Sequence, residues 1–144
     1  MATTIKFKKL NENAVLPKFA NEGDAGLDVC SVQSLTIEAG ARALVKTGVA
    51  IELPKGWEAQ VRSRSGLAYK HGVAVLNSPG TIDEPYRGEI GVILINHGTE
   101  PYKIEIGDRI AQLVLRRTED VIPVFVDELT ETVRGEGGFG STGY

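Results

Sequence analysis

Apolar and polar residues alternate with a period of two in several short stretches of the chain, the pattern of strands with one buried and one exposed face. This alternation occurs at residues 5–8, 57–62 and 103–106. Two further stretches, 91–95 and 121–126, are more continuously apolar and predict strands with more burial. Pro123 would place the second of these at a sheet edge or a bulge, because proline cannot donate a ladder hydrogen bond.

Helical periodicity is confined to residues 65–72, where we expect one or two turns with Ser65 as the N-cap and Gly72 as the C-terminal stop. Glycines recur at short intervals between Gly23 and Gly107, as they do where tight turns join short strands. The sequence therefore predicts an all-β domain, a jelly-roll-like sandwich or barrel, with one short helix after Ser65.

Composition narrows the possible classes of protein. The chain has 144 residues, 42% hydrophobic and 24% charged, as in a single globular domain. Its net charge of −3 argues against a nucleic-acid-coating protein, because such proteins are usually basic. The longest apolar run, Ile90–Ile95, is far shorter than the ~20 residues of a membrane helix. We therefore expect neither a nucleic-acid nor a membrane partner.

The single cysteine, Cys30, cannot form an internal disulfide, and with only two histidines in the chain a Cys/His zinc site is excluded. The first residues also lack the apolar region of a secretory signal. These features predict a cytoplasmic protein, or one inside a host cell if the source is a phage or virus.

Residues 134–144 form a tail with five glycines in eleven residues. Such a terminus is usually flexible and has no core of its own. Here, however, Arg134, Phe139 and two hydroxyl residues lie among the glycines, and these can pair with phosphate, stack on a base and approach an anion. We therefore divide the chain into a β domain, 1–133, and a mobile lid, 134–144.

Arg62–Gly66 combines two arginines, two serines and a glycine at the start of the predicted helix, a composition that suits phosphate binding. The alternative is a solvated strand end with surface arginines. Gly80–Glu89 is bracketed by glycines and follows a predicted strand, so we expect a hairpin that holds Asp83 in a fixed pose. The alternative is a charged turn in which Asp83 caps its own backbone.

Two more loops carry polar side chains next to predicted strands. In Gly23–Asp28, Asp24 or Asp28 can orient a basic partner or a metal-bound water, or form an ordinary Asx-turn. In Gly107–Val114, Gln112 shares a strand face with aliphatic neighbours, as a satisfied core amide or as a ligand of an anion or water. Both histidines, His71 and His97, are interpreted as structural.

Five motifs follow one another along the chain: Ala25–Asp28, Arg64–Ala68, Gly80–Glu89, Gly107–Leu113 and Arg134–Gly143. In this order they resemble the motifs of the trimeric dUTPases, the deoxyuridine triphosphate nucleotidohydrolases, over essentially the whole chain. The resemblance implies a jelly-roll homotrimer with three active sites at subunit boundaries. It also implies hydrolysis of dUTP to dUMP and pyrophosphate with Mg²⁺, the ion being held by substrate phosphates and water rather than by protein ligands.

The resemblance also implies roles for individual residues at the nucleoside end of the substrate. Asp83 resembles the base that holds the attacking water, and Tyr86 the ring that excludes a ribose 2′-hydroxyl. Asn77 matches a uracil contact, and Phe139 resembles a ring that stacks over uracil. The backbone of Gly80, Thr81 and Ile82 would present hydrogen-bonding groups to the base.

At the phosphate end, the resemblance implies contacts from two parts of the chain and support from Asp28, an acid that organises the site. The phosphate-binding residues it implies are Arg64, Ser65, Gly66, Gln112, Arg134, Gly140, Ser141 and Thr142. Two positions depart from the family pattern: Pro85 stands where many members have aspartate, and Cys30 is interpreted as a small buried residue. The alternatives are a relative of the dCTP deaminases and a non-catalytic nucleotide-binding β-sandwich.

Overall fold

The computed structural model describes residues 2–143; Met1 and Tyr144, the last residue of the predicted tail, lie outside the described residues. The regular secondary structure of the described chain consists of antiparallel strands and one short helix, α1 (Ser65–His71). The strands are β1 (Lys6–Lys9), β2 (Gly26–Cys30), β3 (Leu35–Ile37), β4 (Arg42–Glu52), β5 (Trp57–Arg62), β6 (Val73–Val75), β7 (Gly80–Ile82), β8 (Glu89–Asn96), β9 (Tyr102–Ile104) and β10 (Arg109–Arg117).

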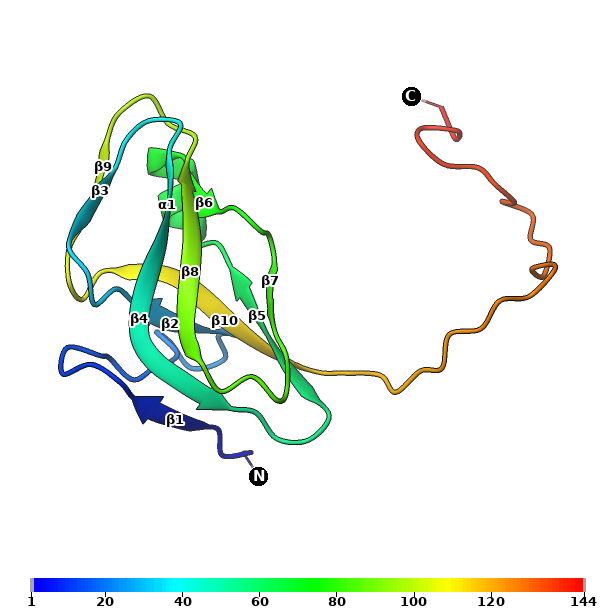
Figure 1. Cartoon of the computed structure of the whole chain (residues 1–144). Helices are drawn as coiled ribbons and strands as arrows, with labels where there is room; N and C mark the ends of the chain where they lie inside the picture. The colour runs from blue at the N-terminus through cyan, green and yellow to red at the C-terminus, as the bar shows by residue number, and fades with distance from the viewer. Residues whose placement is uncertain (1, 144) are drawn as a thin grey trace.

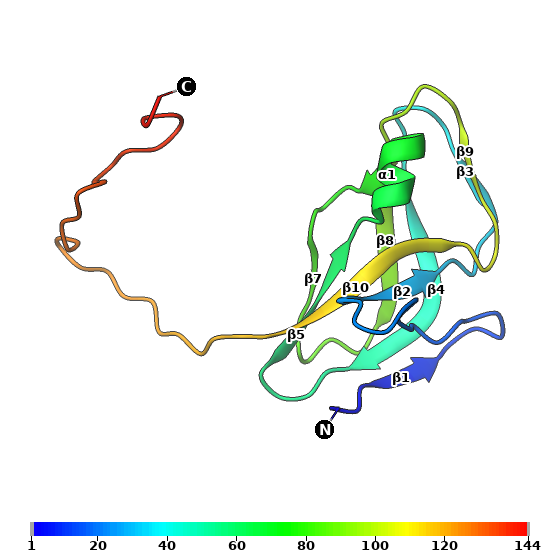
Figure 2. The ribbon, with the colours of Figure 1, turned by 180° about the vertical axis from the view of Figure 1, so that it is seen from behind.

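Two four-stranded sheets form the body of the molecule. Their strand orders are β1-β4-β8-β6 and β2-β10-β5-β7, and β3 pairs with β9 in a separate two-stranded ribbon. The sheets face each other as the layers of a sandwich, with α1 near one end (Figures 1 and 2). This is the jelly-roll-like architecture that the alternating pattern predicts.

The core lies between the two sheets. Val45 and Val92 from the first sheet and Ala59 and Leu113 from the second have no exposed surface. The alternation predicted for residues 57–62 is confirmed, because Ala59 and Val61 are buried and Arg62 is exposed. The alternation predicted for 103–106 is only partly present, since β9 ends at Ile104 and Ile106 is half exposed.

One polar side chain, Asn96, is fully buried in this core. Its amide nitrogen donates to the carbonyls of Ile37 and Glu100, at 2.9 and 2.8 Å, and its oxygen accepts from the amide of Gly98 at 2.8 Å. With its donors and acceptor all used, Asn96 ties the end of β8 to β3 and to the β8–β9 loop at little desolvation cost.

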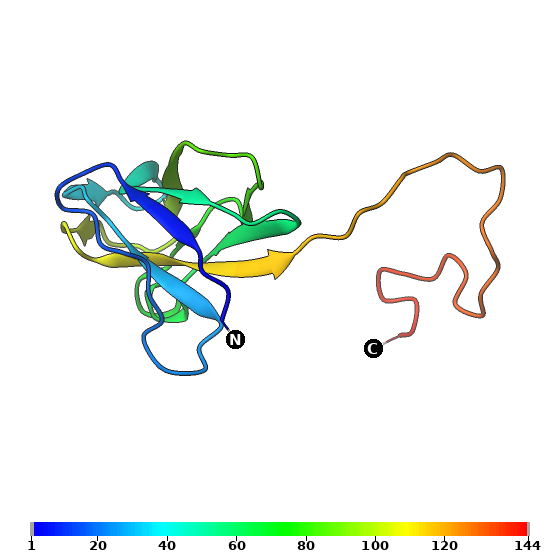
Figure 3. The ribbon, with the colours of Figure 1, turned by 90° about the horizontal axis from the view of Figure 1, so that it is seen from below.

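The strand predicted over residues 121–126 is wrong for the single chain. After β10 the chain leaves the sheets and runs away from the sandwich without regular structure (Figure 3). Val121, Ile122 and Val124 are 74–89% exposed, and Phe125 is completely exposed. We call residues 118–133 the arm and 134–143 the tail. The apolar sequence of the arm finds no surface to cover within its own chain.

Two local predictions are also corrected. The hairpin predicted at Gly80–Glu89 is not formed, because β7 pairs with β5 whereas β8 pairs with β4 and β6. The chain therefore crosses from one sheet to the other between β6 and β7 and returns before β8. Ser65 is the first helical residue rather than the N-cap, which is Arg64 without a side-chain capping bond. Gly72 does end the helix, with a left-handed φ of 69°. Within residues 2–143, no helix has the length and apolar character needed to cross a bilayer.

Candidate active site

The first candidate site is a cleft of about 200 Å³ beside β7, which we call the β7 cleft. It brings together six of the residues singled out in the sequence: Asn77, Gly80, Thr81, Ile82, Asp83 and Tyr86. Because β7 is the outermost strand of its sheet, the backbone groups on its far side face the cleft rather than another strand. The cleft can therefore read the edge of a planar ligand by its N–H and C=O groups.

Close packing fixes the entrance to β7. A Cβ atom on Gly80 would lie 3.2 Å from the Cβ of Val61 and 3.3 Å from Nδ2 of Asn77. The Asn77 side chain thus rests against the glycine at the start of the edge strand. A larger residue at position 80 would push this amide away from the cleft.

A turn connects Asp83 to Tyr86, with the amide of Tyr86 donating to the carbonyl of Asp83 at 3.1 Å. Pro85 occupies the turn and restricts its backbone. The Glu84 carboxylate accepts a hydrogen bond from the amide of Gly56 at 2.7 Å, which ties the turn to the β4–β5 connection. The exposed Asp83 carboxylate is therefore carried on a braced backbone.

The ring of Tyr86 is held in one orientation. Its hydroxyl donates to the carbonyl of Glu89 at 2.8 Å, and a Cβ on Gly88 would lie only 2.4 Å from that hydroxyl oxygen. Any side chain at position 88 would displace the ring. The side chain of Glu89 in turn accepts from the amide of Gly48 at 2.9 Å, which anchors the start of β8 to β4.

A second cleft, of about 370 Å³, lies around Asp28 on β2, at the opposite edge of the same sheet from β7, and we call it the Asp28 cleft. It collects five more of the predicted residues: Asp28, Arg64, Ser65, Gly66 and Gln112. Its lining is mainly polar and combines two guanidinium groups with hydroxyl, amide and carboxylate groups, a combination that suits a phosphate-bearing ligand.

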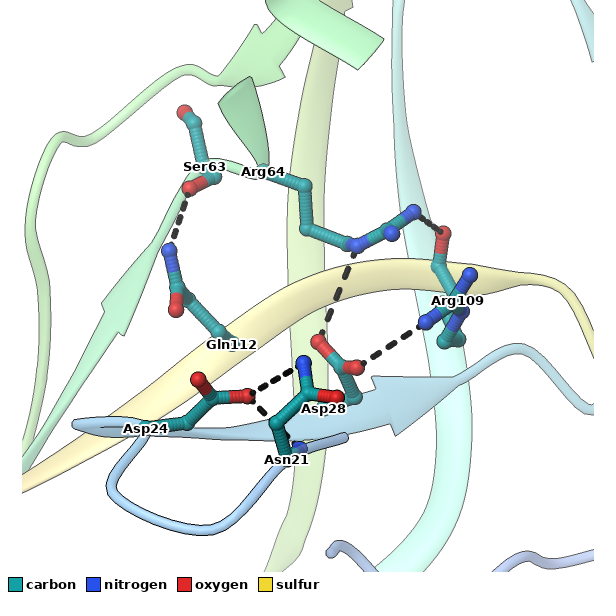
Figure 4. A network of polar contacts seen from close by, with 7 residues as sticks. All are labelled: Asn21, Asp24, Asp28, Ser63, Arg64, Arg109 and Gln112. Atoms are coloured by element: carbon teal, nitrogen blue, oxygen red, sulfur yellow. Dashed lines mark hydrogen bonds and ion pairs between the residues drawn. The ribbon is translucent and has the colours of Figure 1, made fainter. Parts of the chain in front are cut away.

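Asp28 is the centre of this second cleft (Figure 4). One carboxylate oxygen lies 3.6 Å from Nε of Arg64 and the other 3.3 Å from Nη1 of Arg109. Of the two sequence interpretations, the structure therefore supports Asp28 as the orienter of basic partners. Asp24 instead accepts from the backbone and side-chain amides of Asn21, as in an ordinary polar turn.

Arg109 lies in the fourth motif, but its spacing of three residues from Gln112 would place the two on opposite faces of a regular strand, so the sequence indicates no role for it. Its partner position on β2 is Cys30, two residues beyond Asp28. Only the pairing of β2 with β10 brings the Arg109 side chain to that carboxylate.

Gln112 is held at the floor of the Asp28 cleft. Its side-chain amide donates to the carbonyl of Ser63 at 3.0 Å. A Cβ on Gly26 would lie 2.1 Å from its Oε1, so glycine is required there to leave room for the amide. The Ser63 hydroxyl accepts from the amide of Val75 at 2.8 Å, so this one residue links β5, β6 and β10.

The tail residues lie away from both clefts of their own chain. Arg134 donates from Nε to the carbonyl of Gly137 at 2.9 Å, a contact inside the tail, and Phe139 is fully exposed. Gly140, Ser141 and Thr142 lie in the same segment, which projects from the sandwich (Figure 2).

Cys30 is buried, as predicted. Burial, assisted by the nearby Asp28 carboxylate, raises the pKa of the Cys30 thiol above its ordinary value. The thiol is therefore protonated at neutral pH and is a poor nucleophile.

His71 was interpreted as a structural residue. The centroid of its ring lies 4.8 Å from that of the Tyr102 ring, and the two rings pack against each other.

A family model and the most similar curated relatives point to the same protein family. A family model described as dUTPase matches residues 12–143. The deoxyuridine 5′-triphosphate nucleotidohydrolase of Clostridium novyi is 58% identical over 136 residues, 94% of this chain and 96% of the relative. That of Clostridioides difficile is 54% identical over 140 residues, 97% of this chain and 98% of the relative.

Solved structures agree with the sequence relatives. The dUTPase of Staphylococcus bacteriophage 80alpha with dUPNHPP has a TM-score of 0.92 at 30% identity and covers 99% of this chain and 100% of that one. A mutant dUTPase from phage phi11 of S. aureus, which coordinates a structural Mg(II) ion, has a TM-score of 0.82 at 26% identity, with 90% and 100% covered. Since the family model spans nearly the whole chain and its close relatives align end to end, the chain belongs to the dUTPase family.

Proposed function

We propose that this protein hydrolyses dUTP to dUMP and pyrophosphate. The observation that carries the proposal is the β7 cleft, where a carboxylate and a locked tyrosine ring lie beside the open backbone of an edge strand. The strand backbone can recognise a base by hydrogen bonds, the tyrosine ring can exclude a ribose 2′-hydroxyl, and the carboxylate can orient a water molecule. The relatives' names, and the dUPNHPP bound by the phage 80alpha enzyme, favour the same substrate.

Uracil would bind along β7, facing the backbone of Gly80, Thr81 and Ile82 and the side chain of Asn77. Cytosine would leave a buried donor or acceptor unpaired, which makes discrimination strong. The tight contacts around Gly80 leave little room for the thymine methyl group. Tyr86 would lie under the deoxyribose and exclude a 2′-hydroxyl.

Asp83 would act as the base that holds and deprotonates the attacking water, in line with the scissile bond at the α-phosphorus. Its exposed carboxylate on a braced turn suits this role, because the group must reach a solvent molecule without moving. General-base assistance of this kind contributes about 10²–10⁴-fold in rate.

The triphosphate would bind in the Asp28 cleft. Arg64, Ser65, Gly66 and Gln112 would contact its oxygens, and Asp28 would hold Arg64 in place. The tail would then close over the substrate, with Arg134, Gly140, Ser141 and Thr142 at the phosphates and Phe139 over the uracil. Closure would exclude bulk water and strengthen each electrostatic contact.

Mg²⁺ would be held mainly by substrate phosphate oxygens and water, a common arrangement for this ion. Both oxygens of Asp28 already face guanidinium groups, which argues against direct ligation by this carboxylate. The oxygens of Asp24 and Asp28 are suited to accept hydrogen bonds from metal-bound water. When bound, the ion would neutralise part of the phosphate charge.

The decisive experiment is hydrolysis resolved by nucleotide, with and without Mg²⁺. We expect dUTP to be converted to dUMP and pyrophosphate, and dCTP, dTTP and UTP to be hydrolysed at least about a hundredfold more slowly, as a hydrogen-bonding pocket allows. Conversion of dCTP to dUTP would instead support a deaminase. Binding of dUTP without turnover would support a non-catalytic module, against which the presence of Asp83, Arg134 and Phe139 argues.

A homotrimer is the second part of the proposal. Two apolar surfaces of the single chain support it. Leu44 and Leu76 are 60% and 40% exposed on the outer face of the β1-β4-β8-β6 sheet. A groove of about 480 Å³, which we call the apolar groove, opens beside β1, β5 and β10. It is lined by Ala2, Thr3, Ile5, Phe7, Leu16, Pro17, Phe19, Ala25, Leu27, Trp57, Leu113 and Leu115.

The occupant we propose for the apolar groove is the arm of a neighbouring copy. The arm exposes Ile122, Phe125 and Leu129, each at least 85% accessible, which is an unusual amount of apolar surface for a free segment. A head-to-tail exchange around a threefold axis would cover all three arms and all three grooves. It would also carry each tail toward another subunit, so that an active site could draw on several chains.

Charged substitutions in the arm test this assembly. Ile122→Asp with Phe125→Asp is expected to shift the protein from trimer to monomer in sedimentation equilibrium, because two carboxylates would enter an apolar groove. Glu119→Gln, a change in the same arm that adds no buried charge, should leave the trimer intact. A stable and fully active monomer of the unmodified chain would refute the trimer, and a trimer unaffected by the double substitution would refute arm docking.

A further inference from the structure

We propose that Arg109 is a positioning residue of the phosphate site. It neutralises Asp28, and so leaves the charge of Arg64 and the Nη2 group of its guanidinium available to the substrate's phosphates. The inference rests on the proposed function, and it assigns a role to a residue for which the motif comparison implies none.

The geometry around Asp28 is a three-member chain of alternating charge (Figure 4). The Asp28 side chain is only 16% exposed, that of Arg64 25% and that of Arg109 52%. Each carboxylate oxygen serves a different guanidinium, at 3.6 Å for Arg64 and 3.3 Å for Arg109. Because the carboxylate is largely shielded from water, these pairs are stronger than ion pairs on an open surface.

Arg109 also holds Arg64 through its backbone. The pairing of β10 with β2 shifts register between Arg109 and Ala111, as at a β-bulge. At this irregularity the carbonyl of Arg109 accepts a hydrogen bond from Nη1 of Arg64 at 3.3 Å. Bulges commonly re-aim groups next to functional sites. Arg109 therefore acts on the Arg64 guanidinium in two ways. Its side chain acts through Asp28, and its backbone carbonyl accepts a hydrogen bond directly.

The consequence is a defined orientation for Arg64. Its Nε faces Asp28 and its Nη1 faces the Arg109 carbonyl. In the part of the chain that the structure describes, Nη2 is thus the guanidinium nitrogen left for a ligand in the cleft, which Ser65, Gly66 and Gln112 also line. An arginine already held at two of its nitrogens loses less side-chain entropy when a phosphate binds the third.

The charge balance gives the stronger effect. The two guanidinium groups of the cleft balance two carboxylates, those of Asp24 and Asp28, so its lining is neutral. Without Arg109, Arg64 alone would face both carboxylates and the local charge would fall to −1. In a chain whose overall charge is −3, that local negative charge would add to the repulsion of a polyanion by the whole protein.

The test compares Arg109→Gln and Arg109→Lys with Lys103→Gln, a matched loss of one positive charge at an exposed position on β9. The probes are the non-hydrolysable triphosphate dUpNHpp and the phosphate-free nucleoside deoxyuridine. We expect Arg109→Gln to weaken dUpNHpp binding about tenfold, as for the loss of one charge interaction at an effective dielectric constant near 20, and to leave deoxyuridine binding unchanged. Arg109→Lys keeps the charge and should stay within about threefold of the wild type.

The kinetic readout should follow the binding. In Arg109→Gln the KM for dUTP should rise more than kcat falls, and the difference from wild type should shrink at high salt. A purely structural role would instead lower the melting temperature and weaken both probes. An Arg109→Gln protein that binds dUpNHpp like the wild type would overturn the inference, as would an equal loss for deoxyuridine, for Lys103→Gln or for Arg109→Lys.

Failure of this inference and failure of the proposed function are separable. The binding measurements need no turnover, so an unmodified protein that binds dUpNHpp but does not hydrolyse dUTP would refute the enzymatic proposal alone. An active wild type with an unaffected Arg109→Gln variant would refute the role of Arg109 alone.

Discussion

Asp83→Asn is expected to reduce the kcat for dUTP by at least about a thousandfold, within the range for removal of a general base. Asparagine keeps the size of the side chain and one oxygen acceptor, but it cannot take a proton from water. Asp83 is exposed and only its backbone carbonyl takes part in the turn, so the substitution removes no packing interaction. The trimer, the melting temperature and the affinity for dUpNHpp should therefore be retained.

The neighbouring carboxylate offers a matched control. Glu84→Gln also removes one negative charge from this turn, but glutamine can still accept the hydrogen bond from the amide of Gly56. We expect its turnover to stay within about threefold of wild type, as for a neutral replacement that keeps its hydrogen bond. Near-normal turnover in Asp83→Asn, or an equal loss in Glu84→Gln, would contradict the assignment of the base.

Removal of residues 134–144, the tail together with Tyr144, is expected to lower activity by about a hundredfold or more, the loss typical of removing a group that stabilises transition-state charge. The truncated protein should still fold and form trimers, because Phe139 is fully exposed and the tail contributes nothing to the core. Circular dichroism and sedimentation check these two properties beside the assay. A truncation that melts the domain would show that the tail is structural.

Truncation at residue 118 separates the two functions of the C-terminal segment. Loss of the arm as well as the tail exposes the apolar groove in every copy, so this shorter chain should be monomeric or aggregated as well as inactive. If both truncations behave alike in sedimentation, the arm does not hold the trimer together.

Mixed trimers test whether a tail serves a different subunit. Asp83→Asn chains have a tail but no base, and truncated chains have the base but no tail. When both inactive proteins are unfolded and refolded together, we expect activity to return, because some sites will combine Asp83 of one chain with the tail of another. Recovery would not occur if each tail closed over its own chain.

Much of the body could be predicted because its signals are local. The alternation in residues 57–62 depends only on the two faces of one strand, and Ala59 and Val61 are buried as expected. Gly72 ends the helix because glycine adopts a left-handed φ without strain. The side chains of the Asp28 cleft lie in short motifs whose residue types suit phosphate binding, and these can be recognised without their positions in space.

The errors and omissions arose where a residue's environment comes from elsewhere in the molecule. Residues 80–89 are bracketed by glycines as in a hairpin, but β7 and β8 pair in different sheets. Residues 121–126 have the apolar density of a buried strand, but the surface they would cover is absent from their own chain. Local propensity can indicate an extended segment, but not what it pairs with.

The amino-acid order by itself determined the β architecture, the short helix with its glycine stop, and the set of side chains able to handle a nucleotide, because each follows from neighbours within a few positions. Only the tertiary structure decided that these side chains divide between two clefts at opposite edges of one sheet, that Arg109 meets Asp28, and that the arm projects from the body. Those outcomes depend on which strands pair, such as β2 with β10 and β5 with β7. Strand pairing is set by burial across the whole sandwich, which no short window of sequence contains.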